Sequence, residues 1–156
     1  MVLIRDLSVY DSPPVPYGDY DGLIIRCFNG QYKDDKFELH KAGAKAADKP
    51  WWAYSFYNFH FPPLPQVQAA INILQGDSGN LPLAFDVEEW QNPKGVWHRF
   101  PPRIELLDNL HVLYSTYYSW SGKNPFFYMN PAAIHYIKPI PGWLANCPLW
   151  IAHWGV

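Results

Sequence analysis

The chain has 156 residues, of which 12 are Lys or Arg and 14 are Asp or Glu, so its net charge is -2. This length fits one domain with its own hydrophobic core. The nearly balanced charge provides no basic surface for nucleic acid or anionic lipid, so nucleic acid is not an expected partner. The N-terminal residues do not resemble a signal peptide, and no apolar run is long enough to span a membrane. We therefore expect a soluble protein made in the cytoplasm, with no membrane insertion.

Aromatic residues make up 18% of the chain, with 8 Trp and 11 Tyr. Their flat apolar faces and polar tips suit packing against a sugar ring, although many must belong to the core. The two cysteines, Cys27 and Cys147, lie on predicted strands far apart in the sequence, so we expect free buried thiols. The six histidines show no paired ligand spacing, which argues against a metal enzyme, and no cofactor is expected.

Apolar runs bounded by turn residues predict six strands along the chain. They cover residues 3–8, 22–28, the first half of 51–61, 81–90, 125–130 and 148–154. Helical spacing of apolar residues, or a proline at the start, predicts four helices between them. These cover residues 34–48, 65–74, about 103–118 and 131–137. The expected buried stripe of the third helix is Ile104, Leu107, His111 and Tyr114.

Strands that alternate with helices in this way indicate a parallel α/β sheet. Six strands at this spacing resemble most of a TIM-like (β/α) barrel, which needs eight strands to close. The sequence ends directly after the sixth predicted strand, so we expect either an open sheet or missing residues. Because nothing suggests a linker, residues 1–156 are expected to form a single domain.

The fourth predicted strand is an apolar run that ends in the carboxylates of Asp86, Glu88 and Glu89. Catalytic groups of parallel α/β proteins collect where the strands end. Because side chains alternate along a strand, Asp86 and Glu88 share one face and Glu89 takes the other. The Cα atoms of Asp86 and Glu88 would lie about 6.6 Å apart, and like charges this close raise one pKa. A protonated acid beside an ionised partner is the requirement of glycoside hydrolysis, although acidic residues after a strand can also simply solvate a loop or cap a helix.

Other candidate residues lie on or after neighbouring predicted strands. Asp6 is at the end of the first strand. Arg26 is the one charge in the second strand and needs a carboxylate partner or a ligand, so an ion pair and a site role are both open. Tyr54 could face a cleft or pack under a helix. The loop of residues 91–102, which carries Trp97, borders the carboxylates and could form a substrate wall.

In their order and spacing, these motifs resemble the glycoside hydrolase family 25 lysozymes. The motifs are Asp6-Leu7-Ser8, Leu23-Ile24-Ile25-Arg26, Ala53-Tyr54-Ser55-Phe56, residues 81–88, Pro125-Phe126-Phe127-Tyr128 and Pro148-Leu149-Trp150-Ile151-Ala152. The resemblance implies a TIM-like barrel and cleavage of the β-1,4 bond between N-acetylmuramic acid and N-acetylglucosamine in peptidoglycan. Bacteriophage endolysins and bacterial autolysins belong to this family, so the implied place of action is the bacterial cell wall, for a phage protein after phage-mediated release.

The same resemblance implies roles for individual residues. Glu88 corresponds to the general acid and base, Asp86 to the carboxylate that stabilises the reacting centre, and Asp6 to the acid that completes the cluster. Partial burial and the charge of Asp86 are both expected to raise the pKa of Glu88. The resemblance leaves open whether Asp86 acts as a nucleophile or assists the substrate's own N-acetyl group. The positions that line the groove are Arg26, Tyr54, Tyr128 and Trp150.

The chain departs from the family's pattern at its C-terminus. The family has two further strands, with a Trp-Gln-Tyr type motif and a fourth acidic residue, and the resemblance places both beyond Val156. We therefore expect residues 1–156 to be a C-terminally incomplete catalytic domain, whose open barrel edges another segment or subunit could cover. A glycan-binding module without turnover is the alternative function. A chitinase fits less well, because its motif carries another Asp where this chain has Ala84.

Overall fold

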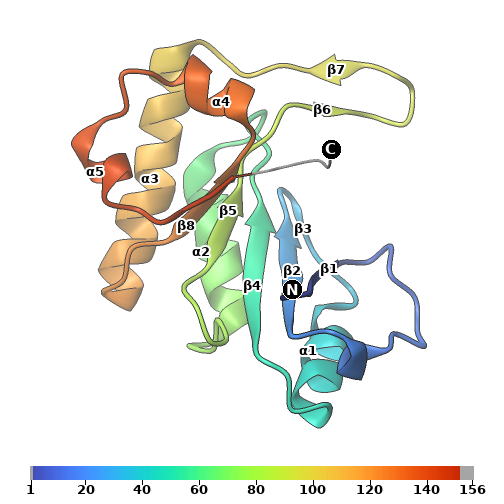
Figure 1. The fold of residues 1–156 in the computed structure, drawn as a ribbon. Helices are drawn as coiled ribbons and strands as arrows, with labels where there is room; N and C mark the ends of the chain where they lie inside the picture. Colours follow the sequence, from blue (N-terminus) through green and yellow to red (C-terminus); the bar gives the residue numbers. More distant parts are fainter. Residues whose placement is uncertain (1, 152–156) are drawn as a thin grey trace.

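The computed structural model describes residues 2–151 and has a curved, mainly parallel sheet at its centre (Figure 1). Six parallel strands follow one another across the sheet in their order along the chain. They are β1 (Ile4–Leu7), β2 (Gly22–Asn29), β4 (Trp51–Phe56), β5 (Ala84–Asp86), β8 (Phe126–Met129) and β9 (Leu149–Ile151). The parallel α/β architecture and the six strands are confirmed, although β5 is shorter than predicted. Residues 152–154, the end of the last predicted strand, lie outside the described residues.

Helices cover the outer, convex face of the sheet (Figure 1). They are α1 (Phe37–Ala46), α2 (Pro63–Leu74), α3 (Arg103–Ser121), α4 (Pro131–Tyr136) and α5 (Gly142–Ala145), with a 3-10 turn at Tyr17–Asp19. The short α4 begins at a proline and is capped by Asn130, whose side chain accepts a hydrogen bond from the backbone N–H of Ala133. Within residues 2–151 no helix has the length and apolar character needed to cross a membrane.

The main core lies between the helices and the outer face of the sheet. Its members from α3 are Leu106, Leu110, Leu113 and Tyr117. The predicted stripe on this helix was therefore wrong in part, since Ile104 is 71% exposed and Leu107 and Tyr114 only flank the core. Both stripes have helical spacing, and packing decides between them: the hydroxyl of Tyr117 accepts a hydrogen bond from the backbone N–H of Leu83.

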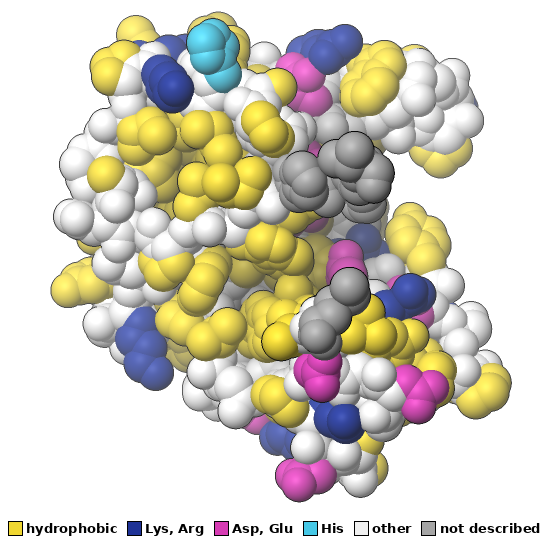
Figure 2. Space-filling model, viewed as in Figure 1, with side chains coloured by type: hydrophobic (Ala, Val, Ile, Leu, Met, Phe, Trp, Pro, Cys, Tyr) yellow, Lys and Arg dark blue, Asp and Glu magenta, His cyan; other side chains and the backbone are white. Residues whose placement is uncertain are grey.

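The inner, concave face of the sheet is only partly covered. A small cluster of Ile24, Tyr54 and Ala84 lies on it, with Trp52, Phe126 and Trp150 packed around. Ile24, Trp52, Phe126 and Trp150 border an open groove of about 670 Å³ that also reaches β1 and β9. Hydrophobic side chains gather on this side of the molecule (Figure 2). Within residues 2–151, β1 pairs only with β2 and β9 only with β8, so the sheet forms a half-barrel with two open edges.

Two antiparallel hairpins were not predicted from the sequence. β3 (Tyr32–Lys33) folds back on the end of β2 through a turn in which Gly30 has φ +60°. β6 (Trp90–Gln91) pairs with β7 (Trp97–His98) inside the stretch predicted to be a loop, and the pair projects from the body of the molecule (Figure 1). Both hairpins lie beyond the C-terminal ends of the parallel strands, where they border the site described next.

Candidate active site

Five neighbouring parallel strands bring the candidate residues to one face of the sheet. Asp6 lies in β1, Arg26 in β2, Tyr54 in β4, Asp86 in β5 and Tyr128 in β8. Arg26 is in register with Tyr54, and Asp86 is in register with Tyr128. Residues in register on neighbouring strands point to the same face, so these side chains all project into the concave side near the strands' C-terminal ends.

The carboxyl groups of Asp86 and Glu88 lie close enough to act on each other. Oδ1 of Asp86 is enclosed by protein and has no hydrogen-bond partner among residues 2–151. Burial, followed by the charge of Glu88, raises the pKa of Asp86 well above its usual value. Burial also raises the pKa of Glu88, although its interaction with Asp86 opposes that change. Both shifts favour a protonated carboxyl group, which is the form that general acid catalysis requires.

This pair differs from the sequence prediction in one respect. β5 ends at Asp86, so Glu88 does not lie two regular strand positions further along. Burial raises the pKa of Glu88, which is the direction that we expected.

Asp6 and Tyr54 connect β1 with β4 beside this pair. Their side chains lie close enough to act on each other. Burial raises the pKa of the Asp6 carboxyl, while the interaction with Tyr54 and the charge of Arg26 oppose the rise. Tyr54 is 7% exposed, and burial raises the pKa of its phenol. Tyr54 thus faces the carboxyl cluster, so the cleft-facing alternative is the correct one for this residue.

Arg26 forms a buried ion pair and also acts on the carboxyl cluster. Its Nε donates to Oδ2 of Asp34 at 2.9 Å, and the two side chains are 10% and 0% exposed. Its charge lowers the pKa values of Asp6 and Asp86. The ion-pair alternative is therefore confirmed for Arg26, and its site role stays a prediction. Asp34 was not recognised, because its contact with Arg26 depends on the unpredicted β2–β3 hairpin.

Tyr128 and Trp150 border the opposite side of the cluster. Their ring centroids lie 4.5 Å apart. Burial and the charge of Glu88 raise the pKa of Tyr128 to about 12, so its hydroxyl remains a hydrogen-bond donor at neutral pH. Trp150 lines the open groove of the inner face together with Asp6. The two aromatic residues therefore form a wall at the β8–β9 side of the half-barrel.

A second groove of about 480 Å³ extends from Arg26 between the two hairpins. Residues that the sequence analysis did not single out form most of its lining: Tyr10, Asn29, Tyr32, Phe56, Asn58 and Trp90. Trp90 stacks on His98, with ring centroids 3.8 Å apart and planes at 12°. The side chains are aromatic or amide-bearing, a combination that suits neutral sugars with N-acetyl groups.

Glu89 points away from the cluster, as side-chain alternation predicted. Its carboxylate contacts Nη1 of Arg99 at 2.6 Å and accepts the backbone N–H of Phe100 at 3.0 Å. The guanidinium of Arg99 also lies 5.0 Å from the ring centroid of Trp97. Glu89 therefore holds the base of the β6–β7 hairpin, which lies where the sequence predicted a substrate wall.

Comparison with known proteins finds similar folds among solved structures only. No protein-family model matches the sequence, and no curated protein matches it significantly. Solved structures do match. A family 25 glycosyl hydrolase from Bacillus anthracis is 21% identical with a TM-score of 0.80, and the match covers 97% of this chain and 70% of that one. A family 25 lysozyme from Aspergillus fumigatus is 20% identical with a TM-score of 0.80, over 99% of this chain and 78% of that one.

The modular autolysin LytC from Streptococcus pneumoniae, solved with a synthetic peptidoglycan ligand, is a third match. It is 17% identical with a TM-score of 0.75, and the match covers 96% of this chain and 37% of the longer LytC chain. Identities of this size establish the shape of the backbone and not the chemistry. The half-barrel of this chain thus has the fold of the family 25 lysozymes.

Proposed function

We propose that this protein hydrolyses the β-1,4 bond between N-acetylmuramic acid and N-acetylglucosamine in bacterial peptidoglycan. The observation that carries the proposal is the pair of interacting carboxyl groups, Asp86 and Glu88, at the C-terminal edge of the sheet. The fold supports it, because solved proteins with this fold include lysozymes and an autolysin bound to a peptidoglycan ligand. The groove with aromatic and amide side chains beside the pair supplies surfaces that suit N-acetylated sugars.

In this proposal Glu88 gives its proton to the glycosidic oxygen as the bond to C1 breaks. General acid assistance of this kind contributes about 10² to 10⁴ in rate. Burial raises the pKa values of both carboxyl groups, so each favours its protonated form before substrate binds. The Asp86 residue is only partly buried, and the N–H of a substrate acetamido group donates to its carboxylate in this proposal. Such a bond favours the ionised form of Asp86 and leaves the proton on Glu88, where the reaction needs it.

We propose that the reaction proceeds with retention, through the acetamido group of the substrate. Asp86 lies beside the proposed acid Glu88, where its carboxylate can stabilise a cationic intermediate. The acetamido oxygen attacks C1 while the leaving oxygen takes the proton of Glu88, and the Asp86 carboxylate stabilises the positive charge that forms on the acetamido group. Water then attacks C1, restores the acetamido group and returns a proton to Glu88.

A glycan-binding module without turnover is the second candidate function. The observation that favours it is the half-barrel itself, since within residues 2–151 one side of the carboxyl cluster is not enclosed by strands. Enclosure excludes water and strengthens electrostatic stabilisation, so an open site is a poorer catalyst. The groove of Tyr10, Phe56 and Trp90 would bind sugar in either case.

Clearing and binding of purified cell walls distinguish these functions. We expect the parent protein to clear a wall suspension, Glu88→Gln to bind walls without clearing them, and Glu89→Gln to clear them nearly as well as the parent. Gln keeps the shape of Glu88 but cannot donate its proton to the leaving oxygen. If the parent protein binds cell walls but releases no reducing sugar ends, which hydrolysis would produce, it is a binding module. Clearing by Glu88→Gln at the parental rate would refute the assignment of the acid.

A further inference from the structure

Asp34 is a fully buried carboxylate that lies next to the site without touching its open surface. The β2–β3 hairpin turns the chain back after Asn29, and the backbone N–H of Asp34 then donates to the carbonyl of Cys27 at 3.0 Å. This places the Asp34 side chain beside Arg26, one residue before Cys27 on β2. Its side chain is 0% exposed. A buried carboxylate is costly unless donors surround it, so its contacts indicate what it does.

Three donors from three segments meet at the Asp34 carboxylate. Oδ2 accepts Nε of Arg26 and the backbone N–H of Val9, both at 2.9 Å. Oδ1 accepts the backbone N–H of Lys36 at 3.0 Å. The carboxylate thus joins β2, the loop that follows β1, and the start of α1. Hydrogen bonds between ionised partners are about twice as strong as neutral ones, so this junction is rigid.

The two groups fixed by Oδ2 both face the candidate active site. The guanidinium of Arg26 acts on Asp6 and Asp86 from β2. Val9 precedes Tyr10, whose ring centroid lies 5.3 Å from Cζ of Arg26. Tyr10 and Arg26 together line the groove of about 480 Å³. One carboxylate therefore sets the position of a cation and of the aromatic ring that covers it.

We propose that Asp34 is a positioning residue: by holding Nε of Arg26 and the backbone of Val9, it keeps the Arg26 guanidinium fixed beside the carboxyl groups of Asp6 and Asp86. That the placement of the Arg26 guanidinium matters for catalysis rests on the proposed function. The placement itself does not rest on it, since it can be measured in a protein without activity. Asp34 touches neither the carboxyl cluster nor the groove and acts only through Arg26 and Val9.

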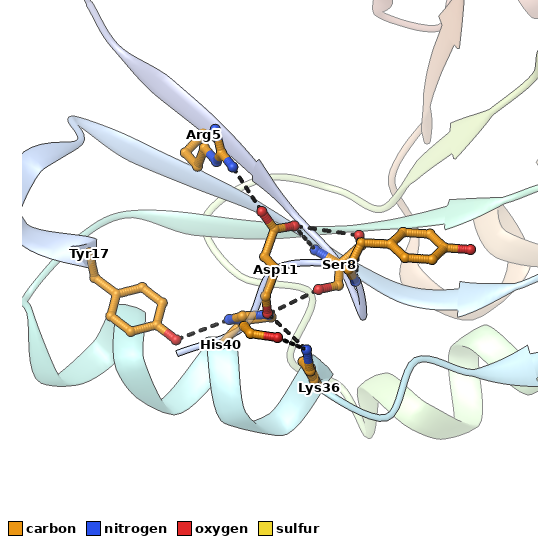
Figure 3. A network of polar contacts seen from close by, with 8 residues as sticks. Arg5, Ser8, Asp11, Tyr17, Lys36 and His40 are labelled. Atoms are coloured by element: carbon orange, nitrogen blue, oxygen red, sulfur yellow. Dashed lines mark hydrogen bonds and ion pairs between the residues drawn. The ribbon is translucent and has the colours of Figure 1, made fainter. Parts of the chain in front are cut away.

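A second network holds the same loop and lets the role of Asp34 be tested without unfolding it. Asp11 accepts the side chain of Arg5 at 2.8 Å and the backbone N–H of Ser8 at 3.0 Å (Figure 3). The imidazole of His40 bonds the carbonyl of Ser8 at 3.1 Å, and Lys36 Nζ bonds the carbonyl of Asp11 at 3.1 Å. These contacts do not involve Asp34. The loop after β1 therefore remains attached to α1 when Asp34 is replaced.

The direction in which the pKa values of Asp6 and Asp86 change shows whether Asp34 positions Arg26 or only contributes its negative charge. Replacing Asp34 by Asn removes a negative charge, and this alone lowers the pKa values of Asp6 and Asp86. If Asp34 holds Arg26 in place, its loss lets the cation move away, and the same pKa values rise. The charge of Arg26 lowers both pKa values in the parent, so its displacement is expected to raise them. The other charges that act on the two carboxyls, on Arg5, Asp11 and Glu88, are unchanged.

The experiment is an NMR titration of the carboxyl carbons of Asp6 and Asp86 in the full chain. Asp34→Asn is compared with Asp35→Asn, an exposed neighbour with the same charge change. We expect Asp34→Asn to raise both pKa values and to abolish the slow exchange of the Arg26 Nε proton, while Asp35→Asn changes neither. A fall or no change in the pKa values of Asp34→Asn overturns the proposal, because Asp34 would then contribute charge alone.

Variants of Arg26 complete the test. In an Arg26→Met background, Asp34→Asn can no longer raise the two pKa values, because the cation it positions is gone. A rise in that background overturns the proposal. If Asp34→Asn does not fold, Arg26→Lys provides the comparison: it keeps the charge but lacks the planar guanidinium that Asp34 orients. We then expect raised pKa values in Arg26→Lys, and parental values would show that charge without orientation is sufficient.

Discussion

At the scale of single residues, burial of Asp86 costs the folded protein stability whenever this carboxyl is ionised. Its enclosed Oδ1 has no hydrogen-bond donor among residues 2–151, and Glu88 places a second carboxyl against it. Groups like this usually persist because a function needs them, since a neutral side chain of the same shape would be more stable there. The structure of the pair therefore predicts a trade between stability and activity.

We predict that Asp86→Asn stabilises the protein at neutral pH. The folded-state pKa of Asp86 is raised above its unfolded value, so the folded protein still binds a proton that the unfolded chain has released. Parental stability therefore falls as pH rises from the unfolded pKa of about 3.9 to the raised pKa of the folded state, by about 1.4 kcal/mol for each unit of difference. Asp86→Asn should lack this fall in stability with pH. The free energy of unfolding, measured with denaturant between pH 4 and 8, tests this. The same pH dependence in Asp86→Asn and in the exposed control Asp35→Asn would contradict the prediction.

The two cysteines are predicted to be unreactive in the folded protein. Burial raises the pKa of Cys27 to about 12 and that of Cys147 to about 11, and the thiolate is the reactive form. We expect no labelling of the native protein by a thiol reagent at pH 8 and complete labelling of both residues in denaturant. Mass spectrometry distinguishes the sites, and rapid native labelling of Cys27 would show that β2 opens readily.

At the scale of elements, tight contacts between backbones fix how the strands and connections fit. Residues 78–80 run along the start of β4: Ala53 donates to the carbonyl of Ser78 at 3.0 Å, and Asn80 donates to the carbonyl of Trp51 at 2.7 Å. Between them, Gly79 forms a bridge with Trp52, and a Cβ at Gly79 would collide with the Trp51 backbone. This approach holds the segment that leads into β5 and its carboxylates.

Gly79→Ala is predicted to destabilise the protein more than Gly76→Ala. Both glycines have φ +89°, so alanine meets the same backbone strain of about 1 to 2 kcal/mol at either position. Only Gly79 lacks space for the added methyl group, which adds overpacking of about 1 to 3 kcal/mol. Equal losses of unfolding free energy in the two variants would mean that the Trp51 backbone moves to make room for the methyl group with no loss of stability.

The sequence predicts an element well when the pattern lies within one segment. It predicts poorly when contacts with a distant segment determine the structure. The six parallel strands and the acids at their ends follow from apolar runs and from positions within one segment. The packed face of α3 was predicted wrongly because the apolar stripes that begin at Ile104 and at Leu106 both have helical spacing. Packing against α2 and β5 buries the stripe that begins at Leu106. Asp34 and the hairpin of β6 and β7 were missed because their partners lie across turns that carry only weak signals.

At the scale of the whole molecule, the half-barrel leaves two strand edges and an apolar inner face uncovered within residues 2–151. Leu149 and Ile151 on β9 are 42% and 51% exposed, and Ile4 on β1 is 46% exposed. Open, apolar strand edges pair readily with other chains. A further segment or a subunit that covers these edges, which the sequence also suggested, would suppress such pairing.

We predict that the isolated 156-residue chain associates as its concentration rises, and that Ile151→Lys reduces this association. A charged side chain on an edge strand disfavours pairing with another edge. Ile104→Lys is the matched control, because Ile104 is 71% exposed on α3, away from both edges. Sedimentation velocity over a range of concentrations compares the variants. Equal association in the two lysine variants would show that the contact lies elsewhere.

The order of strands in this sheet has a consequence for folding during synthesis. β1, β2, β4, β5, β8 and β9 lie side by side in the order in which the ribosome makes them. Each new strand therefore finds its neighbour already present and adds to a growing edge, without waiting for a partner from later in the chain. Folding can then proceed stepwise from the N-terminus, as domains do during translation. The carboxyl cluster would assemble in the same sequence, with Asp6 and Arg26 in place before Asp86 leaves the ribosome.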